Sequence, residues 1–416
     1  MHINEERLWN RINELGEIGR SENGGLNRFS FTDEERQAKE LIKKYMAEAG
    51  LSVREDEIGN VFGKMDGKNP NGKTVLIGSH IDTVLNGGKF DGAVGVLSGI
   101  EVLQTLNEKG ITTENPLEVV AFTDEEGARF STGLLGSEAY IGDLTYNDLA
   151  DNTDNNGISI AEAMINQGYD PTNLASVKAD ANSIKCYLEV HIEQGKVLES
   201  KNVPVGLVTG IAGLRWLKIK INGEAGHAGT TPMALRKDPL AAAVEIIHRV
   251  EQLAKEQEQT VMTVGQFIVN PGGINVIPSN VEFTIDIRDL SEALLDQLVT
   301  QINNMTHNIC AKREVTLEVE NLHSVSGVDC SAEVYQSIQT TIEDKGIEVV
   351  KLPSGAIHDA MVIGKITDIG MIFLRTKDGI SHTSEEWCEK EDVSMGAQVL
   401  LGSVIKLAAN SFVQHG

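Results

Sequence analysis

Residues 73–127 contain three segments in a fixed order: "KTVLIGSHIDT", "GAVGVLSGIEVLQTLNEKG" and "LEVVAFTDEEG". The first and third are apolar runs that predict buried strands, and apolar residues recur at helical spacing in the second. Strand, helix, strand is the pattern of an α/β unit, in which the two strands lie parallel in one sheet. We therefore predict an α/β fold with a mixed, mostly parallel sheet and flanking helices.

The segments on either side continue this pattern. "FTDEERQAKELIKKYMAEAG" predicts a helix that begins at a capping box formed by Thr32 and Glu35 and ends at Gly50. "SVREDEIGNVFGKM" predicts a hairpin. The same α/β character returns near the C-terminus, where "TDIGMIFLR" predicts a strand and "SMGAQVLLGSVIKLAAN" a closing helix.

The middle of the chain follows a different pattern. Alternating apolar residues in "LRWLKIKING" and "NVEFTIDIRD" predict half-exposed strands, and "DPLAAAVEIIHRVEQLAKEQ" predicts a helix capped by Asp238. His248 and His307 lie inside predicted helices and are interpreted as structural. We expect one domain from residues 1–211 and 329–416, and an inserted α+β domain from residues 212–328.

The composition excludes several classes of protein. The chain has 416 residues with 36 Lys and Arg against 61 Asp and Glu, a formal net charge of -25. Such acidity is unsuited to nucleic acid or an anionic membrane, and no apolar stretch is long enough to span a bilayer. The N-terminal segment is an amphipathic helix rather than a signal peptide, so we expect a cytoplasmic protein that handles small molecules. The cysteines are too scattered for a disulfide framework or a zinc ribbon: Cys186, Cys310, Cys330 and Cys388.

Histidines and carboxylates gather at or just beyond the ends of predicted strands. Because the carboxyl ends of parallel strands meet at one edge of a sheet, we expect these side chains to converge there. Taken singly, each has a simpler interpretation, such as a hydrogen-bonded histidine, a helix N-cap or a solvated turn. We interpret Asp124 as a solvated turn residue. The candidates are His80, Asp82, Asp91, Glu125, Glu126, His191 and His382.

Several motifs carry a resemblance to a known family. "GSHIDTV", "KFDGA", "DEEGARF", "HIEQG", "GHAGTTPM", "DIRD" and "DGISH" resemble, in order and chemistry, the M20 family of co-catalytic metallopeptidases and amidohydrolases. The finer pattern is similar to its ureidohydrolase branch, which contains N-carbamoyl-L-amino-acid hydrolases, ureidopropionases and allantoate amidohydrolases. The resemblance runs from about residue 5 to the C-terminus.

The resemblance implies two divalent metal ions per subunit. One would be held by His80 and His191 and the other by Glu126 and His382, with Asp91 bridging the two through both oxygens. Histidine and carboxylate ligands at an open site suit Zn²⁺, with Mn²⁺ or Co²⁺ as substitutes.

The resemblance also implies roles for residues around the metals. Asp82 would orient the imidazole of His80. Glu125, pointing away from Glu126 on an extended backbone, would be the general base. His227 would donate to the developing oxyanion, unless it merely lies in a turn. Gln194 would hydrogen-bond the ureido group.

Asn275 and Arg288 resemble the pair that holds the substrate carboxylate, a task suited to a guanidinium group. The simpler alternative is that Arg288 pairs with Asp286 or Asp289 at the surface. Arg215 is a further candidate for substrate binding.

The loop "SGAIHDA" departs from the branch, which usually has Gly where this chain has Ile357. A branched side chain disfavours positive φ and narrows an adjacent pocket, so substrate choice is in doubt. Gly355 and His358 are expected pocket residues.

The expected activity is hydrolysis of an N-carbamoyl-L-amino acid to the amino acid, ammonia and CO₂. The alternatives are allantoate hydrolysis to ureidoglycine, ammonia and CO₂, an M20-type carboxypeptidase or aminoacylase, and a metal-binding protein without activity. The last is disfavoured because Glu125 and all five implied ligands are present. The resemblance further implies a homodimer that binds a small anionic ureido substrate, with the insert acting as lid and dimerisation domain and His227 reaching the partner's metals.

Overall fold

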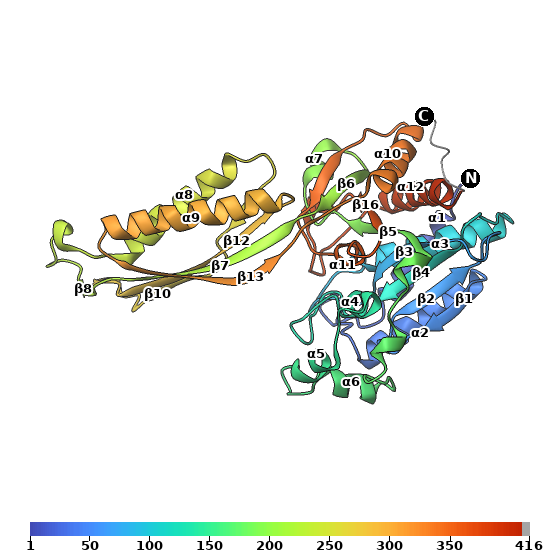
Figure 1. Ribbon diagram of the computed structural model, residues 1–416, viewed down its shortest axis with the longest axis horizontal. Coiled ribbons are helices and arrows are strands. Elements are labelled where there is room, and N and C mark those ends of the chain that lie inside the picture. The colour runs from blue at the N-terminus through green and yellow to red at the C-terminus, as the bar shows by residue number, and fades with distance from the viewer. Residues whose placement is uncertain (410–416) are drawn as a thin grey trace. The chain divides into compact units, whose positions relative to one another are not determined.

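The computed structural model describes residues 1–409, which form two compact units (Figure 1). The first unit contains residues 1–209 and the chain from Cys330 onward, and the second contains residues 210–329. We call the second unit the insert. The boundaries between the units fall at 209/210 and 329/330. The predicted domain boundaries are 211/212 and 328/329.

A nine-stranded sheet organises the first unit, in the order β1-β2-β4-β3-β5-β16-β6-β14, with β15 paired to β6. Its four central strands, β4, β3, β5 and β16, are parallel, and antiparallel pairs flank them. This mixed sheet confirms the predicted fold class. The strands are β1 (Ser52–Glu55), β2 (Val61–Met65), β3 (Thr74–His80), β4 (Leu117–Phe122), β5 (Ile184–Ile192), β6 (Val205–Ile211), β14 (Val328–Asp329), β15 (Lys351–Ser354) and β16 (Asp368–Leu374).

The central strands are buried on both faces, as expected of parallel strands covered by helices. In the register of β3 and β4, His80 lies beside Phe122. The parallel pairing of β3 with β5 brings the end of β5 to the same edge. One edge of the sheet therefore carries the segments that follow three apolar strands.

One large apolar core holds helices to this sheet, and a smaller core packs short helices and loops against one another. The larger contains residues of α1 (Glu5–Leu15), α2 (Asp33–Glu48), α3 (Ala93–Glu108), α10 (Ala332–Asp344) and α12 (Lys390–Ala408), and the smaller surrounds α4 (Leu135–Ile141) and α6 (Ile160–Asn166). The short helices are α5 (Tyr146–Asp151), α7 (Val197–Lys201) and α11 (Asp359–Ile363), with 3₁₀ turns at Leu174–Ser176, Ala181–Ser183, Met233–Leu235 and Lys377–Gly379. No helix within residues 1–409 is long and apolar enough to cross a membrane.

The insert is an antiparallel sheet with the strand order β10-β12-β7-β13, in which β9 also pairs with β12. Strand β12 alternates buried and half-buried residues, and its buried side packs against α8 and α9. A separate two-stranded sheet joins β8 and β11. The elements are β7 (Gly213–Asn222), β8 (Gly226–His227), α8 (Pro239–Lys255), β9 (Val261–Thr263), β10 (Phe267–Asn270), β11 (Val276–Ile277), β12 (Asn280–Asp289), α9 (Glu292–Lys312) and β13 (Thr316–Val325).

Helix α3 packs directly on the backbone of the sheet at Gly95. A Cβ atom added there would lie 2.4 Å from the Val190 carbonyl oxygen and 2.9 Å from the Ser79 Cβ. Glycine is needed at this position because backbone atoms cannot give way as a flexible side chain can.

We predict that Gly95→Ala destabilises the protein. Gly to Ala within a helix normally adds about 0.5–1 kcal/mol of stability. Here overpacking against β5 should instead lower the free energy of unfolding by about 1–3 kcal/mol, measured by urea denaturation. Gly265→Ala, in the loop between β9 and β10, is the control for adding a methyl group without a close contact, since the nearest atom to its added Cβ is the Thr284 hydroxyl at 3.9 Å. Equal stability of the two variants would contradict this packing argument.

Candidate metal centre and active site

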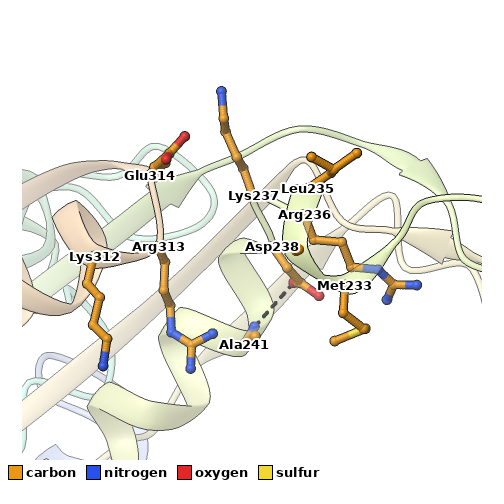
Figure 2. Close-up of a pocket in the computed structure, with 10 residues that line it drawn as sticks. Met233, Leu235, Arg236, Lys237, Asp238, Ala241, Lys312, Arg313 and Glu314 are labelled. Carbon is orange, nitrogen blue, oxygen red and sulfur yellow. Dashed lines mark hydrogen bonds between the residues drawn. The ribbon is translucent and has the colours of Figure 1, made fainter.

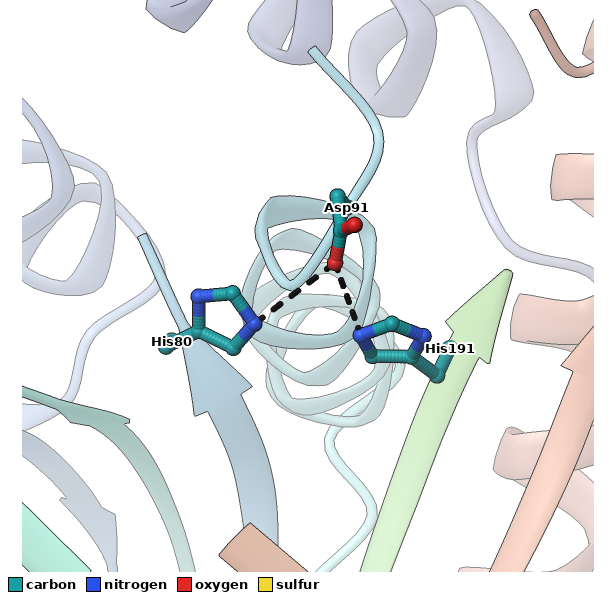
Figure 3. Close-up of side chains that lie close together, drawn as sticks. All are labelled: His80, Asp91 and His191. Atoms are coloured by element: carbon teal, nitrogen blue, oxygen red, sulfur yellow. Dashed lines mark ion pairs between the residues drawn. The ribbon is translucent and has the colours of Figure 1, made fainter. Parts of the chain in front are cut away.

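Three buried residues from three elements meet at the carboxyl edge of the sheet (Figure 3). His80 is the last residue of β3, His191 is the second-last of β5, and Asp91 lies just before α3. Asp91 Oδ1 is 3.0 Å from His191 Nε2 and 3.7 Å from His80 Nε2. The sheet topology thus brings together residues separated by more than a hundred positions in the chain.

The other oxygen of Asp91 faces a second group of side chains. Asp91 Oδ2 is 3.2 Å from His382 Nε2, and that nitrogen is 3.7 Å from Glu126 Oε1. Two groups of candidate ligands therefore share Asp91. Within each group, the ligand atoms all lie within 4.8 Å of one another. The first group is His80, Asp91 and His191, and the second is Asp91, Glu126 and His382. All five predicted metal ligands therefore converge, with Asp91 shared.

The donor atoms fit two divalent cations. Within residues 1–409, His80 Nε2 and Glu126 Oε1 are buried without a hydrogen-bond partner, as ligand atoms facing a cation would be. His191 places Nδ1 3.0 Å from the Ile192 carbonyl oxygen, and His80 places Nδ1 3.3 Å from the Asp82 carbonyl oxygen. When these Nδ1 atoms donate, the neutral rings present Nε2 lone pairs to the centre.

The charges around Asp91 and Glu126 also favour a bound cation. Burial acts to raise the pKa of Asp91, but His191, His382 and His80 hold that pKa well below its usual value. Burial raises the pKa of Glu126 to about 7, and the charge of Asp91 adds to this effect. Carboxylates this close are stabilised by positive charge, which either protonated histidines or metal ions supply.

Asp82 connects the ends of β3 and β4. Its Oδ1 lies 3.4 Å from His80 Nδ1. Its carboxylate also accepts hydrogen bonds from the backbone N–H groups of Glu125, at 3.2 Å, and Glu126, at 3.1 Å. One side chain therefore contacts His80 and fixes the loop that follows β4.

The structure corrects the expected direction of Glu125. Its Oε2 is 3.5 Å from His80 Nε2, and Glu125 and Glu126 both place a ligand atom within 4.8 Å of the same histidine. The backbone is not extended here, because Asp124 has φ +56° and Asp82 accepts both following N–H groups. Both glutamates therefore face the centre rather than opposite sides.

The interpretation of Asp124 as a solvated turn residue is wrong. Asp124 is 1 % exposed, and its Oδ1 accepts a hydrogen bond from the Ser30 hydroxyl. Burial raises its pKa well above the usual value, and the nearby Asp82 adds to the shift. A buried ion pair lies behind the loop: Lys39 Nζ is 3.0 Å from Glu35 and donates to the Thr123 hydroxyl at 3.2 Å.

Gln194 and His358 also lie at this centre. Gln194 Nε2 donates to Asp91 Oδ2 at 2.8 Å and to the Ser381 hydroxyl at 3.2 Å. The ring of His358 is 4.4 Å from that of His191, and its Nε2 is 2.8 Å from the Ser354 hydroxyl. Gly355 is exposed on the same loop. Ile357 has a negative φ, so its branched side chain causes no backbone strain.

In the insert, His227 and Asn275 lie next to each other. Strand β8 pairs with β11, and the Ala228 N–H donates to the Asn275 carbonyl oxygen at 2.9 Å. His227 is exposed, and its Nδ1 accepts a hydrogen bond from the Gly229 N–H at 3.0 Å. A neutral imidazole in this state carries its proton on Nε2, which is therefore a donor.

The two candidate arginines form ion pairs within the insert. Arg215 Nη2 contacts Glu292 at 2.5 Å and Asp296 at 3.0 Å. Arg288 binds Asp286 through Nε at 3.0 Å and Nη2 at 2.7 Å, which is the simpler interpretation given above. Asp289 instead accepts from the Thr260 hydroxyl at 2.5 Å. His248 and His307 are exposed on α8 and α9.

A cavity of about 420 Å³ lies elsewhere in the insert, beside the first turn of α8 and the end of α9 (Figure 2). Two of its cations are already paired, Lys237 with Glu224 and Arg313 with Glu245. The cavity contains none of the predicted site residues, so we assign the chemistry to the metal centre. It is lined by Met233, Ala234, Leu235, Arg236, Lys237, Asp238, Ala241, Lys312, Arg313 and Glu314.

The buried acids near the centre that were missed from the sequence include Glu189 and Glu386. Glu189 accepts from the Ser79 hydroxyl at 2.7 Å and from the Ala360 N–H at 3.1 Å. It lies two residues before His191 on β5, and that spacing on a strand could have indicated a shared face. Glu386 accepts two backbone hydrogen bonds, and no pattern in the sequence identifies it.

Comparison with known proteins gives a consistent picture. The profile of peptidase family M20/M25/M40 matches residues 76–406. The chain is 51% identical over 406 residues to an N-carbamoyl-L-amino acid amidohydrolase of Geobacillus stearothermophilus, covering 98% of this chain and 99% of the relative. It is 38% identical to allantoate deiminase 2 of Glycine max, covering 92% and 85%. A hydantoinase/carbamoylase family amidase from Burkholderia multivorans has a similar structure, with a TM-score of 0.93, 33% identity and 99% of each chain covered.

Proposed function

The chain belongs to peptidase family M20/M25/M40, and from this membership we propose that it is a metal-dependent hydrolase of N-carbamoyl-L-amino acids. The observation that carries the hydrolytic part is the shared Asp91, whose two oxygens face separate sets of ligand atoms. The substrate class is supported by the relatives named N-carbamoyl-L-amino-acid amidohydrolases, three of which are 36–51% identical over at least 95% of this chain.

The metals would be held by His80, His191, Glu126 and His382, with Asp91 between them. When bound, two Zn²⁺, Mn²⁺ or Co²⁺ ions would polarise the substrate carbonyl and lower the pKa of bound water. Side chains of the protein would supply the general base, the oxyanion donor and the substrate contacts.

Glu125 acts as the general base: it accepts a proton from the attacking water and returns it to the leaving nitrogen. Its position 3.5 Å from His80 supports this role. Asp82 holds the His80 ring in place. The Nε2–H of His227 donates to the oxygen that gains charge in the transition state.

Substrate recognition is the proposed task of five further residues. Arg288 offers a planar guanidinium to the substrate carboxylate once Asp286 is displaced, and the amide of Asn275, which lies beside His227, would reach the same carboxylate from a partner chain. Gln194 contacts the ureido group, while Gly355 and His358 line the pocket. Hydrolysis of R–NH–CO–NH₂ with one water then gives R–NH₂, CO₂ and NH₃.

Allantoate is the second candidate, because the chain is 38% identical to an allantoate deiminase along 92% of its length. Allantoate also presents a carboxylate and ureido groups, so the same residues could bind it. We expect N-carbamoyl-L-amino acids to be the better substrates.

The first functional prediction concerns metal and substrate together. Chelation should abolish activity, because metal ions with water-bearing coordination positions can be removed by a chelator. Adding Zn²⁺, Mn²⁺ or Co²⁺ should restore the activity. Ammonia release should be measured with allantoate beside a panel of N-carbamoyl-L-amino acids, and release of the free amino acid should be measured with their N-acetyl and dipeptide analogues. Full activity in demonstrably metal-free protein would end the proposal, and a higher kcat/KM for allantoate would reverse the order of the substrates.

A second prediction separates the neighbouring glutamates. Glu125→Gln should retain both metals but slow turnover by roughly a hundredfold or more, the range for loss of a general base. Glu126→Gln should lose one metal. Elemental analysis and kcat are measured on the same preparations. Metal loss in the Glu125 variant, with full occupancy in the Glu126 variant, would exchange the two roles.

The geometry of the insert favours a dimeric active site. Arg288 lies eight residues along β12 from Asn280, which is roughly 26 Å at 3.3 Å per residue. His227 is in β8, which pairs with β11, and β11 comes shortly before Asn280 in the chain. These two strands lie beyond the Asn280 end of β12, and Figure 1 shows β8 at the end of the insert. One small substrate cannot touch Arg288 and His227 of the same insert. We propose a homodimer in which His227 serves the partner's metal centre, with lid closure bringing Arg288 to the substrate.

Mixed dimers test this arrangement. A chain with His227→Ala paired with a chain carrying Glu125→Gln should recover up to half of the wild-type activity, because one site has both defects and the other has neither. Dimers are purified through two different tags. In the reciprocal control, wild type paired with a chain carrying both substitutions should be nearly inactive. Activity only in this control dimer would mean that each chain completes its own site.

A further inference from the structure

Glu386 connects the two loops that carry Asp91 and His382. It is 3 % exposed, and its Oε1 accepts the backbone N–H groups of Phe90, at 2.9 Å, and Asp91, at 3.1 Å. Its Oε2 accepts from the Ser381 hydroxyl at 3.0 Å. The same hydroxyl is 3.0 Å from Asp91 Oδ2, so side-chain and backbone contacts converge on Asp91.

The loop before α3 is shaped to admit this carboxylate. A Cβ atom at Gly88 would lie 2.1 Å from Glu386 Oε1, so any side chain at that position would displace the carboxylate. Gly92 has φ +61°, and a Cβ atom there would lie 2.4 Å from the His80 ring. Glycines on both sides of Asp91 therefore allow the loop to pass between Glu386 and His80.

An aromatic cluster holds the same two loops from another side. Phe90 and Trp387, the neighbours of Asp91 and Glu386, contact each other edge-on with ring centroids 5.7 Å apart. Trp9 of α1 contacts both rings, at 5.8 and 5.7 Å, and Lys89 lies 4.7 Å from the centre of the Trp387 ring. The packing fixes the backbones of the two loops, whereas Glu386 accepts the N–H of Asp91 itself.

We infer that Glu386 is a positioning residue of the metal centre, which orients Asp91 so that its two oxygens face separate ligand sets and ties this orientation to the loop of His382. Both metals depend on Asp91. Displacing Glu386 therefore weakens both sites together, unlike loss of His191 or His382, each of which belongs to one site. The inference deepens the proposed function and rests on its metal centre.

The chemistry of the contacts predicts how substitutions behave. Glu386→Ala leaves two buried N–H groups without an acceptor and frees the Asp91 loop. Glu386→Gln keeps an amide oxygen for both N–H groups, and its NH₂ can donate to the Ser381 hydroxyl. A positioning role therefore tolerates Gln but not Ala. The exposed neighbour Glu385 provides the matched control, Glu385→Ala.

The experiment measures Zn²⁺ binding to the metal-stripped full-length protein by competition with a chromophoric chelator. Glu386→Ala should bind both ions ten- to a hundredfold more weakly, the usual effect of losing a residue that orients a metal ligand. Glu386→Gln should restore most of this affinity, and Glu385→Ala should match the wild type. The melting temperature of the metal-free protein shows whether the fold itself has changed.

If Glu386→Ala does not fold, Gly88→Ala replaces it, because the added methyl group displaces Glu386 without removing it. Wild-type Zn²⁺ affinity at both sites in the variant that folds would overturn the inference, and so would a Gln variant as weak as the Ala variant. The proposed function has its own outcomes: wild type that binds no Zn²⁺ contradicts the metal centre. Wild type that binds two ions without releasing ammonia contradicts the substrate only.

Discussion

The buried carboxylate of Asp91 is the constraint on which the rest of the site depends. A charged carboxylate in the protein interior is tolerated only when cations and hydrogen-bond donors surround it. Here three histidines face its oxygens, and the N–H of Asp91 is fixed by a second buried acid, Glu386. The buried carboxylates of Asp91 and Glu126 would repel each other, so the site is stable only with positive charge nearby. Bound metal ions would supply that charge.

The contacts that hold the site around Asp91 come from several segments of the first unit. Asp82 fixes the loop after β4 through two N–H groups, and Asp124 of the same loop accepts a hydrogen bond from Ser30. Parallel strands supply His80 and His191 at one edge. Each loop is held by more than one contact, as the proposed metal centre requires, because its ligand atoms must keep fixed positions.

The insert has a different physical task. Its sheet and two helices form their own core, and its candidate substrate residues are held far apart by the length of β12. A rigid antiparallel sheet cannot bend its ends together, so a partner chain is the simplest source of the missing contact. Arg288 donates to Asp286 through Nε and Nη2, which is the two-point contact that its guanidinium would offer to a substrate carboxylate.

Apolar periodicity and the glycine, cap and strand-end signals were enough to predict the α/β fold, an insert and a set of histidines and carboxylates at one edge of the sheet, whereas the choice of five of them as metal ligands came from the resemblance to the M20 family. Those features are local, or follow from the rule that parallel strands end at one edge. The burial of Asp124, the inward direction of Glu125, the engagement of Arg215 and the role of Glu386 could not be predicted. Each depends on side chains that are distant in the chain and meet only when loops pack: Ser30 with Asp124, Asp82 with the loop after β4, Glu292 with Arg215, and Glu386 with Asp91. Sequence patterns record the periodicity of elements, whereas contacts between loops depend on how the folded elements place the loop ends in space.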